Sequence, residues 1–227
     1  VERERSFIAD AAHELRTPLT ALDLQVQSLR ASTAGGRHED AVQQLEAGVA
    51  RAARLVEQLL ALAREERGGS REHEPVALSD VVREVLEELL PLADGRGIDL
   101  GMERADAVRV AGDREALRVL VRNLLDNAIR YSPEGGRVDL SVERQDGTPP
   151  RAVLAVSDCG PGIPVSERER VFDRFYRVPG TASPGSGIGL ALVRSIAAHH
   201  HARIHLDEGH GGQGLQVTVE FTALAPP

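Results

Sequence analysis

The sequence predicts a long helical hairpin followed by an α/β two-layer sandwich. Up to about residue 66, apolar residues recur at steps of three and four, which is typical of amphipathic helices. From about residue 79 onward, helical patterns alternate with short stretches of alternating apolar and polar residues, which are typical of strands. A length of 227 residues accommodates one or two domains. We expect a first domain at 1–68, a linker at 69–75 and a second domain at 76–227.

Charge and composition exclude several classes of protein. The net charge of -8 makes a general nucleic-acid binder a poor candidate, because such proteins need a basic surface. A single cysteine, Cys159, excludes an internal disulfide framework and indicates a reducing compartment. No apolar run approaches the roughly 18 residues that cross a bilayer, so we expect no direct membrane contact. Since Val1 opens directly in helical sequence, we expect the chain to be the C-terminal part of a longer protein.

The hairpin is expected from two helices, at 1–32 and about 38–66, separated by a breaker at 32–36. The second helix keeps a heptad spacing of its apolar residues: Val42, Leu45, Val49, Ala52, Val56, Leu59 and Ala63. An isolated hairpin buries such narrow stripes poorly, whereas two hairpins form a four-helix bundle. We therefore expect a homodimer. The alternative is a two-helix antiparallel coil packed on the rest of the chain.

The second domain reads as one mixed, mainly antiparallel sheet with helices, most simply a two-layer sandwich. The helix at 79–93 has Ser79 or Asp80 as its expected cap, and the helix at 113–131 has Asp113. A third helix, at 187–200, follows a glycine-rich loop. Strands are expected at 98–104, 107–111, 138–142, 153–155, 202–208 and 214–223.

The first helix carries a candidate nucleophile. His13 lies about 200° around the helix from the apolar Leu15 and should face water, with Thr17 on the same face. Pro18 interrupts the hydrogen bonding of this helix. Glu14 can accept a hydrogen bond from one imidazole nitrogen and leave the other as a nucleophile. The alternative is a solvated histidine on a coiled-coil face.

The segment Phe7–Leu19, which contains His13-Glu14-Leu15-Arg16-Thr17-Pro18, resembles the H box of bacterial two-component sensor histidine kinases. The other boxes of that family follow in order. The resemblance implies a dimerisation and histidine-phosphotransfer domain followed by an ATP-binding domain of the Bergerat (GHKL) type. It also implies that His13 is phosphorylated and that Glu14 and Thr17 are catalytic.

The segment Asn123–Tyr131 resembles the N box. Asn123 and Asn127 stand four residues apart, so their amides share one helical face, and amide oxygens suit Mg²⁺. By resemblance, Asn127 binds magnesium and Asn123 supports it, while Arg130 and Tyr131 contact phosphate and nucleotide. An asparagine pair that caps or hydrates a surface helix is the alternative.

Two glycine-rich segments complete the expected nucleotide site. Asp158-Cys159-Gly160-Pro161-Gly162-Ile163 resembles the G1 box, which assigns Asp158 to the adenine amino group. Gly185-Ser186-Gly187-Ile188-Gly189-Leu190 resembles the G2 box, and its amides open a helix that can hold phosphate. Between them, 171–177 resembles the F box, with Phe175 and Arg177 at the nucleotide, and 179–185 reads as a lid. An Asp-led turn and core phenylalanines are the alternatives.

Taken together, the boxes imply ATP-dependent phosphorylation of His13 and phosphoryl transfer to an aspartate of a response regulator receiver domain. Phosphatase activity on that regulator is also expected, with ATP and Mg²⁺ as cofactors, in the cytoplasmic portion of an inner-membrane sensor.

Two other functions compete. Hydrolytic ATPases of the same superfamily carry a glutamate four residues before the magnesium-binding asparagine, where this chain has Asn123. A non-catalytic dimeric scaffold is the second competitor. A histidine run, His199-His200-His201 with His205 nearby, raises a further possibility of a transition-metal site.

Overall fold

A computed structural model describes residues 73–180, 186–209 and 212–225, with isolated positions at 48, 49, 52, 56 and 58. The chain divides into two compact units, Val1–Arg64 and Glu65–Pro227. The five isolated positions of the first unit are helical, as the sequence predicts for the second helix of the hairpin. The remainder of the predicted hairpin, including His13, lies outside the described residues.

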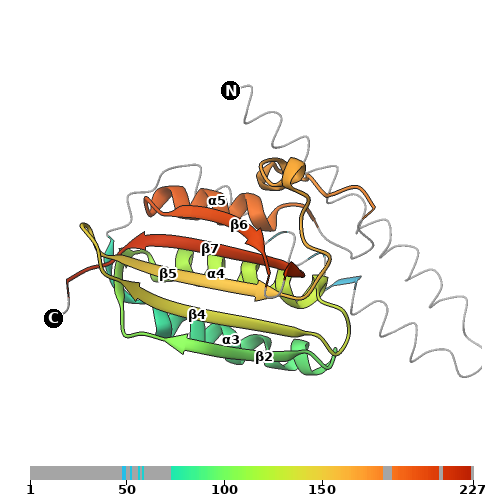
Figure 1. Cartoon of the computed structure of the whole chain (residues 1–227), viewed down its shortest axis with the longest axis horizontal. Coiled ribbons are helices and arrows are strands. Elements are labelled where there is room, and N and C mark those ends of the chain that lie inside the picture. The colour runs from blue at the N-terminus through green and yellow to red at the C-terminus, as the bar shows by residue number, and fades with distance from the viewer. Residues whose placement is uncertain are drawn as a thin grey trace, which may run out of the picture. The chain divides into compact units, whose positions relative to one another are not determined.

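A mixed sheet forms one layer of the second unit (Figure 1). In the described residues it has the strand order β2-β4-β5-β7-β6. Its strands are β2 (Asp99–Ala105), β4 (Arg137–Gln145), β5 (Arg151–Asp158), β6 (Arg203–Glu208) and β7 (Leu215–Thr222). Only the β2–β4 pair is parallel among these neighbours. The predicted sheet, mixed and mainly antiparallel, is therefore confirmed.

Helices α3 (Leu78–Asp94), α4 (Arg114–Tyr131) and α5 (Gly189–His199) cover one face of this sheet (Figure 1). Their buried apolar sides meet the alternating apolar residues of the strands and form the core. Leu117, Leu120 and Leu125 of α4 are fully buried, as are Leu140 of β4 and Leu154 of β5. No described helix has the length and apolar character needed to span a membrane.

The start of α4 follows the predicted pattern, whereas the start of α3 does not. Asp113 caps α4, because its Oδ1 accepts hydrogen bonds from the N–H groups of Glu115 and Ala116. Helix α3 has Ala77 at its N-cap and no side-chain cap. The expected capping by Ser79 or Asp80 is therefore wrong. The preceding strand carries the chain directly into the helix, so both residues already lie inside its first turn.

A small second sheet joins the start of this unit to α4. Strand β1 (Glu74–Ala77) pairs antiparallel with β3 (Arg109–Gly112), which leads into Asp113. Sequence analysis missed β1, because four residues that include a proline give too short a pattern. The strand also begins inside the stretch expected to be linker.

Candidate nucleotide site

The two asparagines of α4 lie together beside the first turn of α5. A Cβ placed on Gly189 would stand 3.2 Å from Asn123 Oδ1 and 3.4 Å from Asn127 Nδ2. Asn123 is buried, and its Nδ2 donates to the carbonyl of Val119 at 2.8 Å. Asn127 is half-buried. The N box and the G2 box, about 60 residues apart in sequence, therefore share one side of the site, and Gly189 leaves the amides room.

The carboxyl group of Asp158, at the end of β5, is buried and tied to backbone. Its Oδ1 accepts hydrogen bonds from the N–H of Gly160 at 2.8 Å and from the N–H of Leu215 at 3.2 Å. Burial raises the pKa of Asp158 above its ordinary value, and the two hydrogen bonds oppose that shift. Among the described residues, no donor is bonded to Oδ2. The side chain therefore presents a fixed acceptor.

Glycines let three backbone segments converge around Asp158. A Cβ on Gly160 would lie 2.8 Å from the carbonyl oxygen of Tyr131, and one on Gly214 would lie 1.8 Å from the carbonyl oxygen of Asp158. Gly162, at φ +70°, leaves no room for a Cβ against the carbonyl of Gly214. The G1 box is thus packed against the end of α4 on one side and the β6–β7 turn on the other.

The F box and the G2 box contact each other through backbone. Phe175 donates its N–H to the carbonyl of Gly187 at 2.9 Å and has a φ of 61°, a left-handed conformation that is strained for a bulky residue. A Cβ on Gly187 would lie 2.6 Å from the carbonyl carbon of Phe175. Ser186 Oγ accepts from the N–H of Ile188, which is fully buried at the start of α5. Leu190 follows in the helix and is half-buried.

The segment before and within the F box contains two 3-10 turns, Val165–Glu167 and Arg170–Phe172. The hydroxyl of Tyr176 donates to Glu167, and the guanidinium of Arg170 lies 4.3 Å from the Tyr176 ring centroid. The hydrogen bond to Glu167 raises the pKa of Tyr176. Arg177 is exposed beyond this cluster. Of the predicted lid at 179–185, the structure describes only the first two residues.

The remaining predicted residues lie at the end of α4, in the G1 box, or outside the described residues. Arg130 pairs with Asp126 one turn earlier on α4 at 2.6 Å, and the half-buried Tyr131 ends that helix. The carbonyl of Ile163 accepts from Arg168 at 3.3 Å. The predicted residues His13, Glu14, Thr17 and Gly185 lie outside the described residues.

The histidine run is engaged in local contacts. His200 Nε2 accepts from the N–H of Asp113 at 3.0 Å, its Nδ1 faces the carbonyl of Ile196, and its ring stacks on His73. His199 Nδ1 faces the carbonyl of Ser195. In the described part of the chain, no three histidine, cysteine, aspartate or glutamate residues are placed to share a metal ion. His200 instead connects the end of α5 to the start of α4.

Several residues of the site were missed by sequence analysis. The β6–β7 turn supplies Gly209, Gly214 and the N–H of Leu215, and its density of glycines is a signal that could have found it. Arg96 bonds the end of α4, and Arg168 bonds the carbonyls of Ile163 and Leu206. Neither arginine lies in a pattern that indicates its role, because most of its partners are backbone carbonyls 33 to 38 positions away.

Cys159 faces the start of β4. Its sulfur accepts a hydrogen bond from the N–H of Arg137 at 3.1 Å, and a Cβ on Gly136 would lie 2.6 Å from it. The residue is half-buried, and its sulfur joins the G1 box to the start of β4.

Comparisons with known proteins agree with this geometry. The family model of histidine kinase-, DNA gyrase B- and HSP90-like ATPases matches residues 112–224, and the model of the His Kinase A phospho-acceptor domain matches residues 3–68. Sensor protein kinase PmrB of Pseudomonas aeruginosa is 39% identical over 228 residues, 100% of this chain and 47% of the relative. The signal transduction histidine-protein kinase/phosphatase MprB of Mycobacterium avium is 39% identical over 99% of this chain and 43% of the relative.

A solved structure gives the same result. Full-length ShkA in complex with AMPPNP matches with a TM-score of 0.65 and 25% identity, over 98% of this chain and 46% of that chain. The chain therefore belongs to the two-component sensor histidine kinases, a class of phosphotransferases, and carries their phospho-acceptor domain and their ATP-binding domain. The family and fold predicted from the sequence are confirmed. The chain spans about half the length of the curated relatives it matches.

Proposed function

We propose that this protein phosphorylates His13 with ATP and then transfers the phosphoryl group to an aspartate of a response regulator. The observation that carries the proposal is that α4 joins the boxes: Asn127 lies beside Gly189 of the G2 box, and the carbonyl of Tyr131 faces Gly160, whose N–H donates to Asp158 in the G1 box. The phospho-acceptor family match to residues 3–68, which contain His13, supports His13 as the nucleophile. We retain the domain limits 1–68, 69–75 and 76–227 as part of this proposal.

In the proposed site each group has a distinct role. The fixed carboxylate of Asp158 accepts a hydrogen bond from the adenine amino group, since its Oδ2 is not occupied by a described donor. Arg130 and Tyr131, at the end of α4, and Arg177, after the F box, contact the nucleotide and its phosphates. The backbone around Gly160, Gly162 and Ile163 surrounds the base. The segment from Phe175 to Leu190 binds the phosphates, because amides at a helix start favour anions.

The donor set at α4 fits a magnesium ion. Asn127 presents a half-buried neutral amide beside Gly189, and Mg²⁺ prefers oxygen ligands together with water and phosphate. The Nδ2 of Asn123 donates to Val119, and its Oδ1 lies on the side of Gly189. When bound, the ion neutralises charge on the phosphates during transfer.

The chemistry at His13 needs no additional reactant. An unprotonated imidazole nitrogen forms a bond to the γ-phosphorus, the bond between that phosphorus and the β,γ-bridging oxygen breaks, and ADP leaves with the negative charge. The other imidazole nitrogen keeps its proton, and its N–H can donate a hydrogen bond to Glu14. The phosphoryl group then passes from this nitrogen to a carboxylate of the regulator.

The same proposal includes a homodimer and a membrane-linked sensor. Val49 and Val56 stand seven residues apart in the predicted heptads and are 52% and 40% exposed in the single chain. Two chains paired through their helical hairpins would cover such positions. We place this portion on the cytoplasmic side of an inner-membrane protein, where response regulators are found.

The test is incubation with γ-labelled ATP and Mg²⁺. A kinase should leave acid-labile label on the protein, a hydrolytic ATPase should release free phosphate, and an inactive scaffold should do neither. His13→Gln should abolish labelling while the affinity for ATP stays at the wild-type value, because the nucleotide residues lie in the other unit. Label entering His13→Gln at the wild-type rate would refute the assignment of His13.

Phosphatase activity is the finer part of the proposal, and the name of MprB as a kinase/phosphatase supports it. Thr17 is expected on the face of His13, where its hydroxyl can orient a water toward the regulator's phosphoaspartate. Thr17→Ala should keep autophosphorylation and lose phosphatase activity, whereas Glu14→Ala should mainly lower autophosphorylation. If Thr17→Ala removes phosphate from the regulator at the normal rate, this division of roles is wrong.

A further inference from the structure

Helix α4 ends without a left-handed glycine cap. Ser132 follows the helix with φ -64° and ψ 144°, an extended conformation that suits a residue before a proline, here Pro133. The chain therefore leaves the helix without the left-handed glycine that usually bonds the last carbonyls. The carbonyls of the last turn need donors from elsewhere in the fold.

Arg96 supplies those donors from the turn between α3 and β2. Its Nη1 donates to the carbonyls of Ile129 at 2.7 Å and Arg130 at 2.8 Å, and its Nη2 donates to the carbonyl of Ser132 at 3.0 Å. A planar guanidinium can reach three acceptors at once, and a positive charge is favourable at a helix C-terminus.

The backbone of Arg96 is itself fixed. Its N–H donates to the carbonyl of Ala93 at 3.0 Å, and its carbonyl accepts from Gly135 at 3.2 Å. Gly97, at φ +63°, then turns the chain from α3 toward β2. Arg96 thus holds the end of α4 from a turn that is anchored on both sides.

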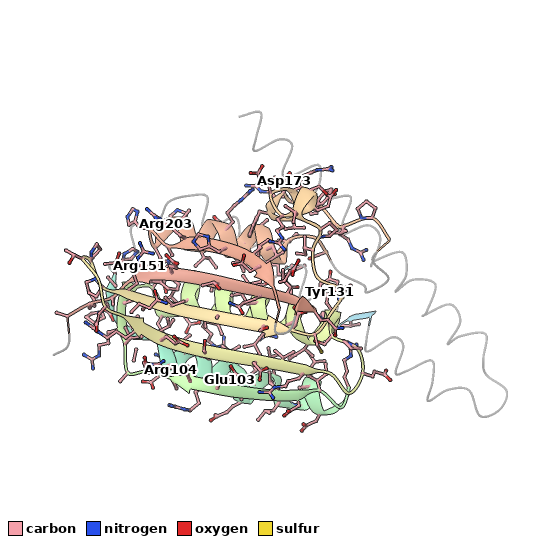
Figure 2. The ribbon with its side chains drawn as sticks, viewed as in Figure 1. Glu103, Arg104, Tyr131, Arg151, Asp173 and Arg203 are labelled. Carbon is pink, nitrogen blue, oxygen red and sulfur yellow. The ribbon has the colours of Figure 1, made fainter. Side chains whose placement is uncertain are left out.

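The end of α4 that Arg96 holds is also the end that meets the nucleotide site. The three bonded carbonyls surround that of Tyr131, which instead faces Gly160 of the G1 box. Figure 2 shows Tyr131 at the same end of the sheet as the carboxyl end of β5, where Asp158 stands. The side chain of Arg130, held by Asp126, leaves the same turn of the helix.

We propose that Arg96 is a positioning residue for nucleotide binding, which fixes the last turn of α4 so that Arg130 and Tyr131 meet the nucleotide beside Gly160. The inference rests on the nucleotide roles given to Arg130 and Tyr131 under Proposed function. Arg96 itself need not touch the nucleotide. Its effect passes through backbone carbonyls, so it should appear as coupling to the residues of that turn.

The experiment measures the Kd of Mg-ATP by displacement of a fluorescent ATP analogue from the full 227-residue chain. Arg96→Gln keeps a polar side chain but removes the planar guanidinium and its charge. We expect it to raise the Kd about tenfold, because binding groups displaced by a fraction of an ångström lose that much affinity. Arg83→Gln is the matched control. It removes the same charge from α3, where Asp80, itself exposed, is the only ion-pair partner of Arg83 among the described residues, and it should leave the Kd unchanged.

A double-mutant cycle separates positioning from general loss of structure. If Arg96 acts through the last turn of α4, Arg96→Gln should add little to the Kd of an Arg130→Gln protein. Additive effects in the double variant would overturn the inference, as would a wild-type Kd for folded Arg96→Gln. A wild-type Kd for Arg130→Gln alone would refute the role of Arg130 on which the inference rests, and that result needs no Arg96 variant.

Arg96→Lys keeps the proposal testable if Arg96→Gln does not fold. One ammonium group keeps the charge and cannot reproduce the three-carbonyl geometry, so the Kd should rise about threefold. A folded Arg96→Lys protein with the wild-type Kd would overturn the inference. Since binding is measured without phosphorylation, failure of His13 to become labelled would not affect either result.

Discussion

The two sides of the nucleotide site are held together in different ways. Around Asp158, the contacts are backbone hydrogen bonds and glycine backbones in close approach, from G1, α4 and the β6–β7 turn. Around the F box, half-buried and exposed side chains make most of the contacts: Tyr176 with Glu167, Arg170 with Tyr176, and the exposed Arg194 with the exposed Asp173 at 3.6 Å. Exposed ion pairs are generally worth about 0–1 kcal/mol.

The difference indicates that the Asp158 side is preformed and that the F-box side can rearrange at small cost. The exception on the F-box side is Phe175, whose positive φ and hydrogen bond to Gly187 fix one point of the segment. A preformed side beside an adjustable segment suits the proposed function, in which the protein binds ATP and then presents its γ-phosphate to a histidine in another domain.

The largest effect is expected from Gly214→Ala, which adds a methyl group to the preformed side of the nucleotide site. The new methyl group would lie 1.8 Å from the carbonyl oxygen of Asp158, at a φ of +79°. Because backbone cannot give way as a flexible side chain can, unfolding free energy should fall by about 3 kcal/mol, measured by urea denaturation.

Gly212→Ala is the matched control on the same turn. Its φ is +77°, almost identical, but among the described residues a Cβ there meets nothing closer than 3.9 Å. It should cost only about 1 kcal/mol, from the backbone conformation alone. Equal losses for the two variants would show that close approach to Asp158 does not hold this side of the site together.

A smaller effect, on affinity rather than folding, is expected from Asp158→Asn. The loss of the carboxylate acceptor should raise the Kd of ATP at least about tenfold, since hydrogen bonds to charged groups are worth about 1.5–3 kcal/mol. An unchanged Kd would contradict the adenine role.

The same variant tests the raised pKa of Asp158. A carboxyl group with a raised folded-state pKa stabilises the fold at pH below its unfolded pKa, and loses that contribution as the pH rises through the folded pKa. At neutral pH the wild type therefore carries the cost of a buried charge, which asparagine avoids. The thermal midpoint of Asp158→Asn should equal or exceed that of wild type, with a difference that shrinks as the pH falls through the raised pKa. A difference that grows with acidification would contradict this account.

The smallest effect is expected from Tyr176→Phe on the F-box side. The ring remains beneath Arg170 and only the hydroxyl bond to Glu167 is lost, so the thermal midpoint should match wild type within error. The chain has two tyrosines, and the phenolate absorbance missing from the variant should titrate above the usual value of about 10, because Glu167 raises the pKa of Tyr176. Glu167→Gln should lower the pKa of Tyr176. A large loss of stability in Tyr176→Phe would mean that side-chain contacts at the F box stabilise the fold.

Local patterns in the sequence predicted most of the second unit. Apolar periodicity predicted α4, and Asp113 predicted its start, because the cap acts within three residues. The pairing of Asn123 with Asn127 is also local, whereas their place beside Gly189 depends on the packing of α4 against α5. Family resemblance, rather than spacing, supplied that connection.

The contacts that sequence analysis missed join distant segments through backbone. Leu215 contributes its N–H to Asp158 across 57 positions, and any residue except proline could do so. Arg96 bonds carbonyls 33 to 36 positions away, and one arginine among many carries no sign of that role. The same holds for His200, whose acceptor nitrogen faces Asp113 across 87 positions.

Arg168 bears on whether the sheets of two copies of this chain can pair through their edge strands. Strand β6 ends the sheet on one side, and its Leu206 carbonyl already accepts Arg168 Nη1 at 2.7 Å. Strand β2 ends it on the other side, where exposed Glu103 and Arg104 project (Figure 2). An edge strand with free backbone groups invites pairing with a neighbour's strand, and charged side chains discourage it. In the proposed dimer two such sheets stay at high local concentration, and we expect Arg168, Glu103 and Arg104 to disfavour pairing of their edge strands.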